Sequence, residues 1–195
     1  DAISNLKPEL RESGFMVLRL GSPLGVKPRH TEFALVRAIN GWKDFFFLDE
    51  EIFENVQPQS FWNERVADAL PLHRLLPKLT ETSMVNLGLG TGLIQKAIGL
   101  DEAEASVIPA TGSCTANFHF RPHRELPDIL HHSSGQVEID SLFLGKRGGV
   151  TCLFVLEAKN SQKLESLAKH KLFYPIMALA SQAQYPIIPL YLRTI

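Results

Sequence analysis

Two stretches in the last third of the chain have the apolar and alternating pattern of β-strands. They cover residues 137–144 and 150–157. The residues between them include three glycines, which favour a tight turn. We therefore predict a β-hairpin whose turn contains Gly145, Gly148 and Gly149.

Acidic and basic side chains gather at the open end of this predicted hairpin. Side chains two positions apart on a strand point to the same face, so Glu157 and Lys159 share a face. If the turn centres at residues 147–148, Asp140 lies opposite Val155 and one diagonal step from Glu157. Two carboxylates and one amine would then converge.

The rest of the pattern predicts helices and strands in alternation. Thr31 is a plausible N-cap for the first helix. The last strand contains two prolines, which indicate an edge or irregular position in a sheet. The predicted strands are 15–20, 116–120 and 185–193, and the predicted helices are 31–39, 61–70, 93–100 and 160–183.

The composition is that of an ordinary globular protein. The chain has 195 residues, of which 45% are hydrophobic, and a net charge of -1, so any contact with nucleic acid needs a local basic patch. Its two cysteines lack metal-ligand spacing, which favours a reducing cytoplasm. We find no signal segment and no apolar run of 18 residues. Because the chain starts without Met and stops directly after a strand-like run, we expect a fragment of a longer protein.

The charges of the hairpin have a chemical use. Glu157 directly follows the apolar run 152–156, where a buried strand makes a charge costly without a partner. Two nearby carboxylates repel unless a cation lies between them, and Mg²⁺ takes one or two carboxylates together with waters and phosphate oxygens. Lys159 could orient or deprotonate a water for phosphodiester hydrolysis. The alternative is that these residues are ordinary solvated strand ends.

A basic loop is predicted at 121–135. Its histidines fit no zinc signature, and adjacent loop histidines are more often solvated than ligating. We expect the loop to contact phosphate, together with Lys146 and Arg147 of the hairpin turn. The basic residues of the loop are Arg121, His123, Arg124, His131 and His132.

One lysine is unusual within the predicted helix 160–183. Lys171 follows Leu164 by seven residues, so it projects into the apolar stripe that should pack on the sheet. It either extends its amine past the sheet edge or points toward the carboxylates.

The motifs QVEID, FVLEAKN and KHKLFYP, in this order with the hairpin between the first two, resemble the PD-(D/E)xK superfamily of type II restriction-endonuclease-like nucleases. The resemblance covers residues 87–193. It implies that Asp140 and Glu157 bind Mg²⁺, with Mn²⁺ as a substitute, and that Ala158 offers its backbone carbonyl. It also implies that Lys159 positions the attacking water and that Lys171 joins the site from the helix.

Two further acids compete for places in this site. Asp128 follows the literal Pro127 and lies at a separation from Glu157 that the family tolerates. We favour Asp140 because it lies on a strand beside Glu157, whereas Asp128 falls in a loop. Glu138 shares a face with Asp140 and is a possible additional member.

The sequence thus predicts an α/β protein with a mixed sheet flanked by helices. We expect an α+β region over 1–80, for recognition or dimerisation, and a restriction-endonuclease-like core over 81–195. The expected activity is Mg²⁺-dependent cleavage of double-stranded DNA by a homodimer of restriction type. The alternatives are an inactive nucleic-acid-binding module of the same fold and a nuclease for branched DNA or RNA.

Overall fold

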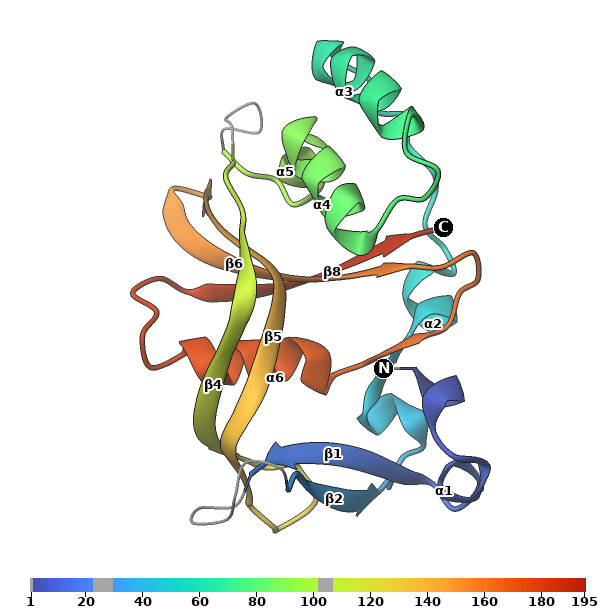
Figure 1. Ribbon diagram of the computed structural model, residues 1–195, viewed down its shortest axis with the longest axis vertical. Helices are drawn as coiled ribbons and strands as arrows, with labels where there is room; N and C mark the ends of the chain where they lie inside the picture. Colours follow the sequence, from blue (N-terminus) through green and yellow to red (C-terminus); the bar gives the residue numbers. More distant parts are fainter. Residues whose placement is uncertain (1, 23–29, 102–106) are drawn as a thin grey trace. The chain divides into compact units, whose positions relative to one another are not determined.

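The computed structural model describes residues 2–22, 30–101 and 107–195 (Figure 1). The chain forms two compact units, each built from separated stretches. Unit 1 comprises Asp1–Asn55, Ser113–Glu138 and Leu164–Ser181; unit 2 comprises Val56–Gly112, Ile139–Lys163 and Gln182–Ile195. The division at residue 80 that the sequence predicts concerns functional regions and stays a prediction. Two long strands, β4 (Ala110–Phe120) and β5 (Leu130–Arg147), contribute residues to both units.

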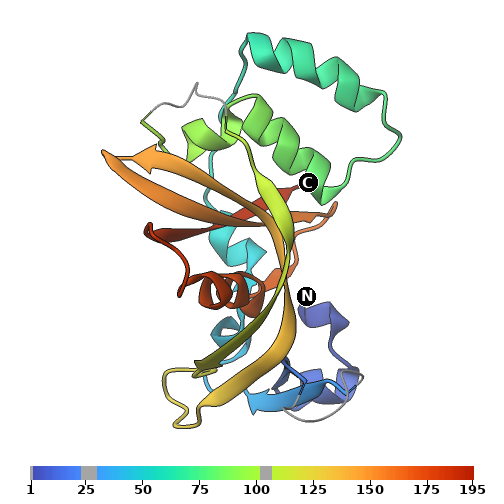
Figure 2. The same cartoon turned by 60° about the vertical axis from the view of Figure 1, so that its left-hand side comes forward.

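Unit 1 combines short helices with strands that pair over long sequence distances. β1 (Phe15–Gly21) pairs with β2 (Glu32–Arg37) in antiparallel register and with β5 in parallel, and β3 (Phe46–Leu48) pairs with β7 (Ser166–Ala168). β4 pairs with β5, and the two lie side by side in Figures 1 and 2. The unit also contains η1 (Ile3–Asn5), α1 (Pro8–Glu12), η2 (Trp42–Asp44), α2 (Asp49–Phe53) and α6 (His170–Leu179).

Unit 2 contains a mixed sheet covered by helices. β6 (Val150–Asn160) pairs with the second half of β5 in antiparallel register and with β8 (Ile187–Thr194) in parallel, and α4 (Glu81–Gly90) packs against β6. β8 ends the strand order, as the two prolines of the predicted strand 185–193 indicated. The unit also contains α3 (Glu64–Arg74) and α5 (Leu93–Ala97). The α/β class and the mixed, helix-flanked sheet are therefore confirmed.

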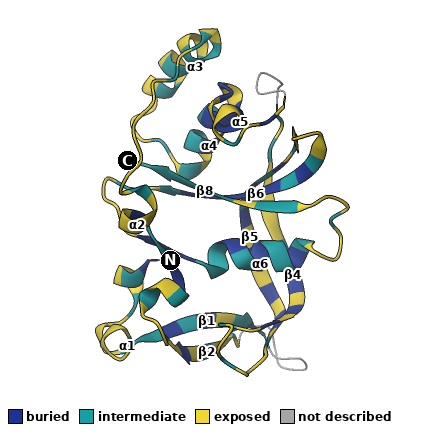
Figure 3. Ribbon diagram, turned by 180° about the vertical axis from the view of Figure 1, so that it is seen from behind, coloured by how far each residue is buried: buried dark blue, intermediate teal, exposed yellow. Residues whose placement is uncertain are grey.

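Each unit has its own hydrophobic core. In unit 1, Phe118 and Phe120 of β4 pack against Tyr174 of α6. In unit 2, Leu89 of α4 belongs to the same cluster as Phe154 of β6. Buried and exposed residues alternate along β4 and β5 (Figure 3), as expected for strands with one face toward a core.

The predicted hairpin is confirmed, but its register differs from our expectation. Arg147 pairs with Val150, so Gly148 and Gly149 alone form the turn. Both have positive φ, 58° and 80°, as a two-residue type I′ turn requires. The turn is thus one residue later than predicted, which moves every partner by two positions.

One predicted helix is wrong, and another is confirmed only in part. Residues 32–37 form β2 rather than a helix starting at Thr31. Residues 161–165 are not helical, and the predicted helix 160–183 contracts to β7 followed by α6. Leu164 consequently lies outside α6, and the stripe that placed Lys171 beside it does not exist.

His131 and His132 lie on β5 and not in the predicted loop. His131 is exposed and His132 is buried, because alternate residues of the strand face opposite sides. The loop between β4 and β5 therefore ends at Ile129.

Both cysteines are free, and Cys152 is buried in the core of unit 2, in agreement with a packing role. None of the helices in the described ranges has the length and apolar character needed to cross a membrane.

Candidate active site

Asp140 and Glu157 meet where the β5–β6 ladder ends. The final residue pair of this antiparallel ladder is Ser141 with Leu156. Continuing the same register by one residue places Asp140 opposite Glu157. Directly opposed residues of an antiparallel pair share a face of the sheet. The Ala158 N–H donates to Asp140 Oδ2 at 3.1 Å, so this carboxylate replaces the missing backbone acceptor.

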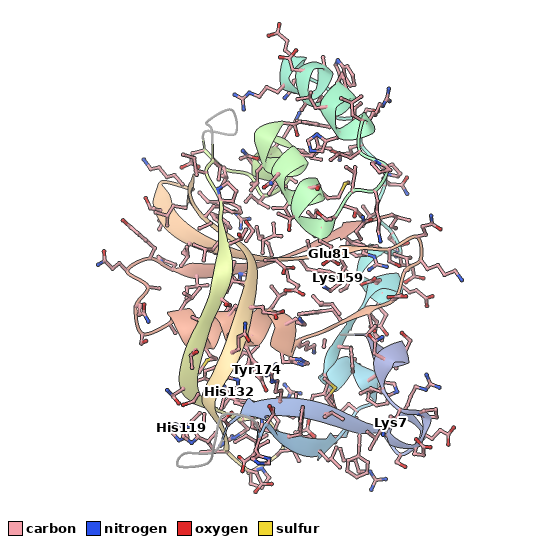
Figure 4. The ribbon with its side chains drawn as sticks, in the orientation of Figure 1. Lys7, Glu81, His119, His132, Lys159 and Tyr174 are labelled. Carbon is pink, nitrogen blue, oxygen red and sulfur yellow. The ribbon has the colours of Figure 1, made fainter. Side chains whose placement is uncertain are left out.

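Lys159 connects two carboxylates at this end of β6. Its Nζ lies 3.1 Å from Glu157 Oε1 and 3.5 Å from Glu81 Oε1, and Figure 4 shows Lys159 beside Glu81. The Glu157 side chain is only 5% exposed, whereas that of Glu81 is 39% exposed. The deeper carboxylate therefore depends more strongly on the lysine for compensation of its charge.

Glu81 is a member of the cluster that sequence reasoning missed. It opens α4, where Thr80 accepts a hydrogen bond from the Ser83 N–H as N-cap. Glu81 Oε1 also accepts the Asn160 N–H at 3.3 Å, which ties the start of α4 to the end of β6. The helix start was readable from Thr80 and Glu81, but no local signal indicates which strand the helix meets.

The pKa of Lys159 shows how strongly the acids act on its amine. Burial alone would lower this pKa, but the attraction of Glu157, Glu81 and Asp140 outweighs burial and raises it above the ordinary lysine value. Lys159 therefore carries a proton at neutral pH. Acidic side chains outnumber the single ammonium described around Lys159, so the formal charge of these residues together is negative.

The remaining predicted acids and Lys171 belong to unit 1. Lys171 is the second residue of α6, and its Nζ lies 3.9 Å from Glu138 Oε2. Asp128 lies in an exposed segment without regular structure. Asp140 does lie on a strand, as the preference for it over Asp128 assumed.

The predicted DNA-contacting residues are all exposed. Arg121 and Arg124 lie in the loop between β4 and β5, where Arg124 Nε is 3.8 Å from Glu125 Oε1. Lys146 and Arg147 end β5 at the tip of the hairpin in unit 2. Solvent exposure is compatible with phosphate contact, and these assignments stay predictions.

We call the group of Asp140, Glu157, Lys159 and Glu81 the acidic site. Its carboxylates are the hard oxygen ligands that Mg²⁺ prefers. The three carboxylates are spread around Lys159, and no three His, Cys, Asp or Glu side chains in the described part of the chain form a metal cluster by themselves. Mg²⁺ requires only one or two carboxylates, with waters and phosphate oxygens completing its shell. Asp140 and Glu157, with Ala158 between Glu157 and Lys159, therefore fit such an ion chemically.

The model of one family, described as a domain of unknown function (DUF6997), matches residues 49–195. Neither the curated proteins nor the solved structures contain a match.

Proposed function

The chain belongs to the DUF6997 family, and from its acidic site we propose that it is a Mg²⁺-dependent nuclease that hydrolyses phosphodiester bonds in DNA. The observation that carries this proposal is the set of three carboxylates around a single protonated lysine, with Glu157 almost fully buried. A net negative site with a buried acid favours a divalent cation.

The order of elements also supports the proposal. Apart from the short β7 before α6, the order α4–α5, β4, β5, β6, α6 and β8 is the one that we expect for a restriction-endonuclease-like core. This core is part of what we propose, together with a restriction-type activity on double-stranded DNA and a homodimeric assembly that provides one site for each strand.

Each residue of the site has a defined task in hydrolysis. Asp140 and Glu157 would hold the cation, with the backbone carbonyl of Ala158 as a further ligand. The cation supplies Lewis-acid polarisation of the phosphate. Lys159 is protonated, so it donates hydrogen bonds that orient the attacking water and offset the charge growing on the phosphate oxygens, and it does not act as a base.

Glu81 acts through Lys159. Its carboxylate accepts from both Lys159 Nζ and the Asn160 N–H, so it fixes the direction of the amine at the end of β6. We infer that Glu81 is a positioning residue of this site.

Cleavage of supercoiled plasmid DNA in Mg²⁺ tests the proposal. We expect Asp140→Asn and Glu157→Gln to lower the rate about 100-fold or more and Lys159→Met to lower it about 100-fold, as for loss of a positioned proton donor. Glu81→Gln should cost about 10-fold. Asp128→Asn should cut at the wild-type rate, because Asp128 lies in an exposed loop.

Two outcomes would count against this assignment. Equal cutting by the wild type and the Asp140, Glu157 and Lys159 variants would refute the site. Retained DNA binding without cutting by any protein would instead favour the inactive binding module.

A further inference from the structure

The N-terminal turn of α6 has an unusual charge pattern. Lys169 is its N-cap residue, His170 and Lys171 follow, and the first turn contains no acidic residue. The N-terminus of a helix carries partial positive charge, which acidic side chains or anions stabilise. Basic residues add to that charge. This turn would therefore be stabilised by an anion, although the charge pattern alone does not define a site.

A cavity of about 200 Å³ adjoins this turn within unit 1. Two cations from different elements line it, Arg19 from β1 and Lys171 from α6. Glu138 pairs with Lys171 at 3.9 Å, but its side chain is 70% exposed and so belongs to the rim. We call this space the histidine cavity; its polar lining includes Arg19, His132, Glu138, His170, Lys171 and Tyr174.

His132 is one of the residues that line the cavity, and one of its ring nitrogens has no partner among the described residues. The residue is 1% exposed, and its ring stacks on Phe118 with ring centroids 4.5 Å apart. Its ring also packs edge-on against Tyr174, and both residues are labelled in Figure 4. Its Nδ1 lies 3.2 Å from the Ala116 carbonyl, which can only accept, so the proton is on Nδ1. The lone pair is then on Nε2, which has no hydrogen-bond partner among the described residues.

His170 also lines the cavity and has a buried ring nitrogen without a hydrogen-bond partner among the described residues. This nitrogen is Nδ1. Burial lowers the pKa of both histidines, to about 4 for His170, so both are neutral near pH 7. A buried polar atom without a partner is destabilising, and a bound ion or water is one of the usual reasons for its presence.

The ligand must satisfy both the cations and the acceptor nitrogen. Arg19, Lys171 and the helix N-terminus require an anion, whereas His132 Nε2 requires a hydrogen-bond donor. Sulfate, carboxylates and the phosphodiesters of a DNA backbone carry no proton near neutral pH. Inorganic phosphate does, and a terminal phosphate monoester does below about pH 6.

We propose that the histidine cavity binds a phosphate group that carries a proton, either inorganic phosphate or the singly charged form of a terminal monoester. Arg19 and Lys171 neutralise the anion, and His132 Nε2 accepts its proton in a hydrogen bond. This inference goes beyond the proposed nuclease activity and does not depend on it, because every residue involved belongs to unit 1.

Calorimetric titration of the full chain at pH 6, without divalent metal, tests the proposal. Inorganic phosphate should bind saturably, and sulfate at least about 10-fold more weakly, because one hydrogen bond is lost and Nε2 stays unpaired. Lys171→Met should weaken phosphate binding at least about 10-fold. His132→Phe keeps the aromatic stack on Phe118 and should abolish the preference for phosphate over sulfate.

Matched controls are available in the same unit. His119 is exposed and stacks on His131, and Lys7 is exposed at the start of α1 (Figure 4). His119→Phe and Lys7→Met should bind phosphate like the wild type. If His132→Phe does not fold, as judged by circular dichroism, the preference for phosphate and the Lys171→Met result still decide the question.

Competition with an oligonucleotide separates the two sources of phosphate. Displacement by a 5′-phosphorylated strand, and not by its unphosphorylated form, assigns the cavity to nucleic-acid ends; failure of both strands to compete assigns it to free phosphate. The proposal is overturned if phosphate shows no saturable binding, if sulfate binds equally well, or if Lys171→Met binds normally. Plasmid cleavage, read separately, reports on the nuclease proposal alone.

Discussion

At the scale of single residues, Lys159 is the group on which the acidic site depends. Its ammonium faces Glu157, Glu81 and Asp140 at once. Without it, the almost fully buried Glu157 would lose the ammonium that lies 3.1 Å from its carboxylate. Removing one partner of a buried ion pair typically costs 3–5 kcal/mol, and the partial exposure of Glu81 reduces this value.

We expect Lys159→Met to lower the free energy of unfolding by about 2 kcal/mol in metal-free buffer. Mg²⁺ should restore most of this loss, because a divalent cation can replace the ammonium between the carboxylates. Urea unfolding with MgCl₂, and with KCl at equal ionic strength, measures both effects. Lys163→Met, at an exposed position of the same unit, is the control. Equal rescue by KCl would argue against a metal site.

His170 predicts a pH dependence of stability. Its pKa falls from 6.5 to about 4 on folding, through burial and the adjacent Lys171. Because the pKa of His170 is lower in the folded protein, unfolding takes up a proton at acidic pH. The contribution of neutral His170 to the free energy of unfolding is therefore complete above pH 6.5 and is lost as the pH falls to about 4. The free energy of unfolding should fall by about 3 kcal/mol over this pH range. His170→Gln should remove this fall, and the difference between the two unfolding curves isolates it from carboxylates such as Glu138.

At the scale of elements, the turn of the β5–β6 hairpin sets the register that aligns Asp140 with Glu157. Gly148 and Gly149 have positive φ, and Asp101 accepts both their N–H groups at 2.7 and 2.8 Å. These two hydrogen bonds are the main reason that the pKa of Asp101 lies below its ordinary value. The hairpin is therefore held by a contact 47 residues away in sequence.

Alanine at either turn glycine should be destabilising. A left-handed backbone costs an L-residue about 1–2 kcal/mol, so Gly148→Ala and Gly149→Ala should each lower unfolding free energy by this amount. Gly112→Ala is the control, because a Cβ there meets no atom within 4 Å and φ is not positive. Thermal or urea unfolding measures the difference. Wild-type stability of both turn variants would contradict the role given to the turn.

The strands of the hairpin could be predicted because their pattern is local. Alternation and three glycines lie within a short stretch, and these indicate both strands and the turn. Residues 32–37 were predicted as helix, yet their buried Val36 and exposed Phe33 and Leu35 follow the twofold period of a strand. An acid near Thr31 resembled a helix start, and pairing with β1 overrode this local signal.

The site residues that could not be predicted from the sequence are those whose position depends on contacts between distant parts of the chain. Asp140, Glu157 and Lys159 meet through one hairpin, so spacing predicted their proximity. Glu81 reaches Lys159 across 78 positions, for which no local pattern exists. His132 was assigned to a loop because adjacent polar residues obscured the start of β5, and only the strand reveals that its side chain is buried.

At the scale of the whole molecule, the chemistry divides between the two units. Unit 2 contains the acidic residues around Lys159, and unit 1 contains the cationic and imidazole groups of the histidine cavity. Both units are assembled from separated stretches of the chain. A cut between two continuous domains therefore cannot separate the two proposed activities, and point variants are the appropriate means.

We predict that two variants separate the activities in the intact chain. Glu157→Gln should abolish the calorimetric heat of Mg²⁺ binding and leave phosphate binding unchanged, because its carboxylate belongs to unit 2. Lys171→Met should have the opposite effect. The double variant should lose both Mg²⁺ binding and phosphate binding. Its change in the free energy of unfolding should equal the sum of the changes in the two single variants within about 0.5 kcal/mol, as for residues without shared partners. Loss of Mg²⁺ binding in Lys171→Met would instead place Lys171 in the acidic site, as the resemblance to PD-(D/E)xK nucleases implies.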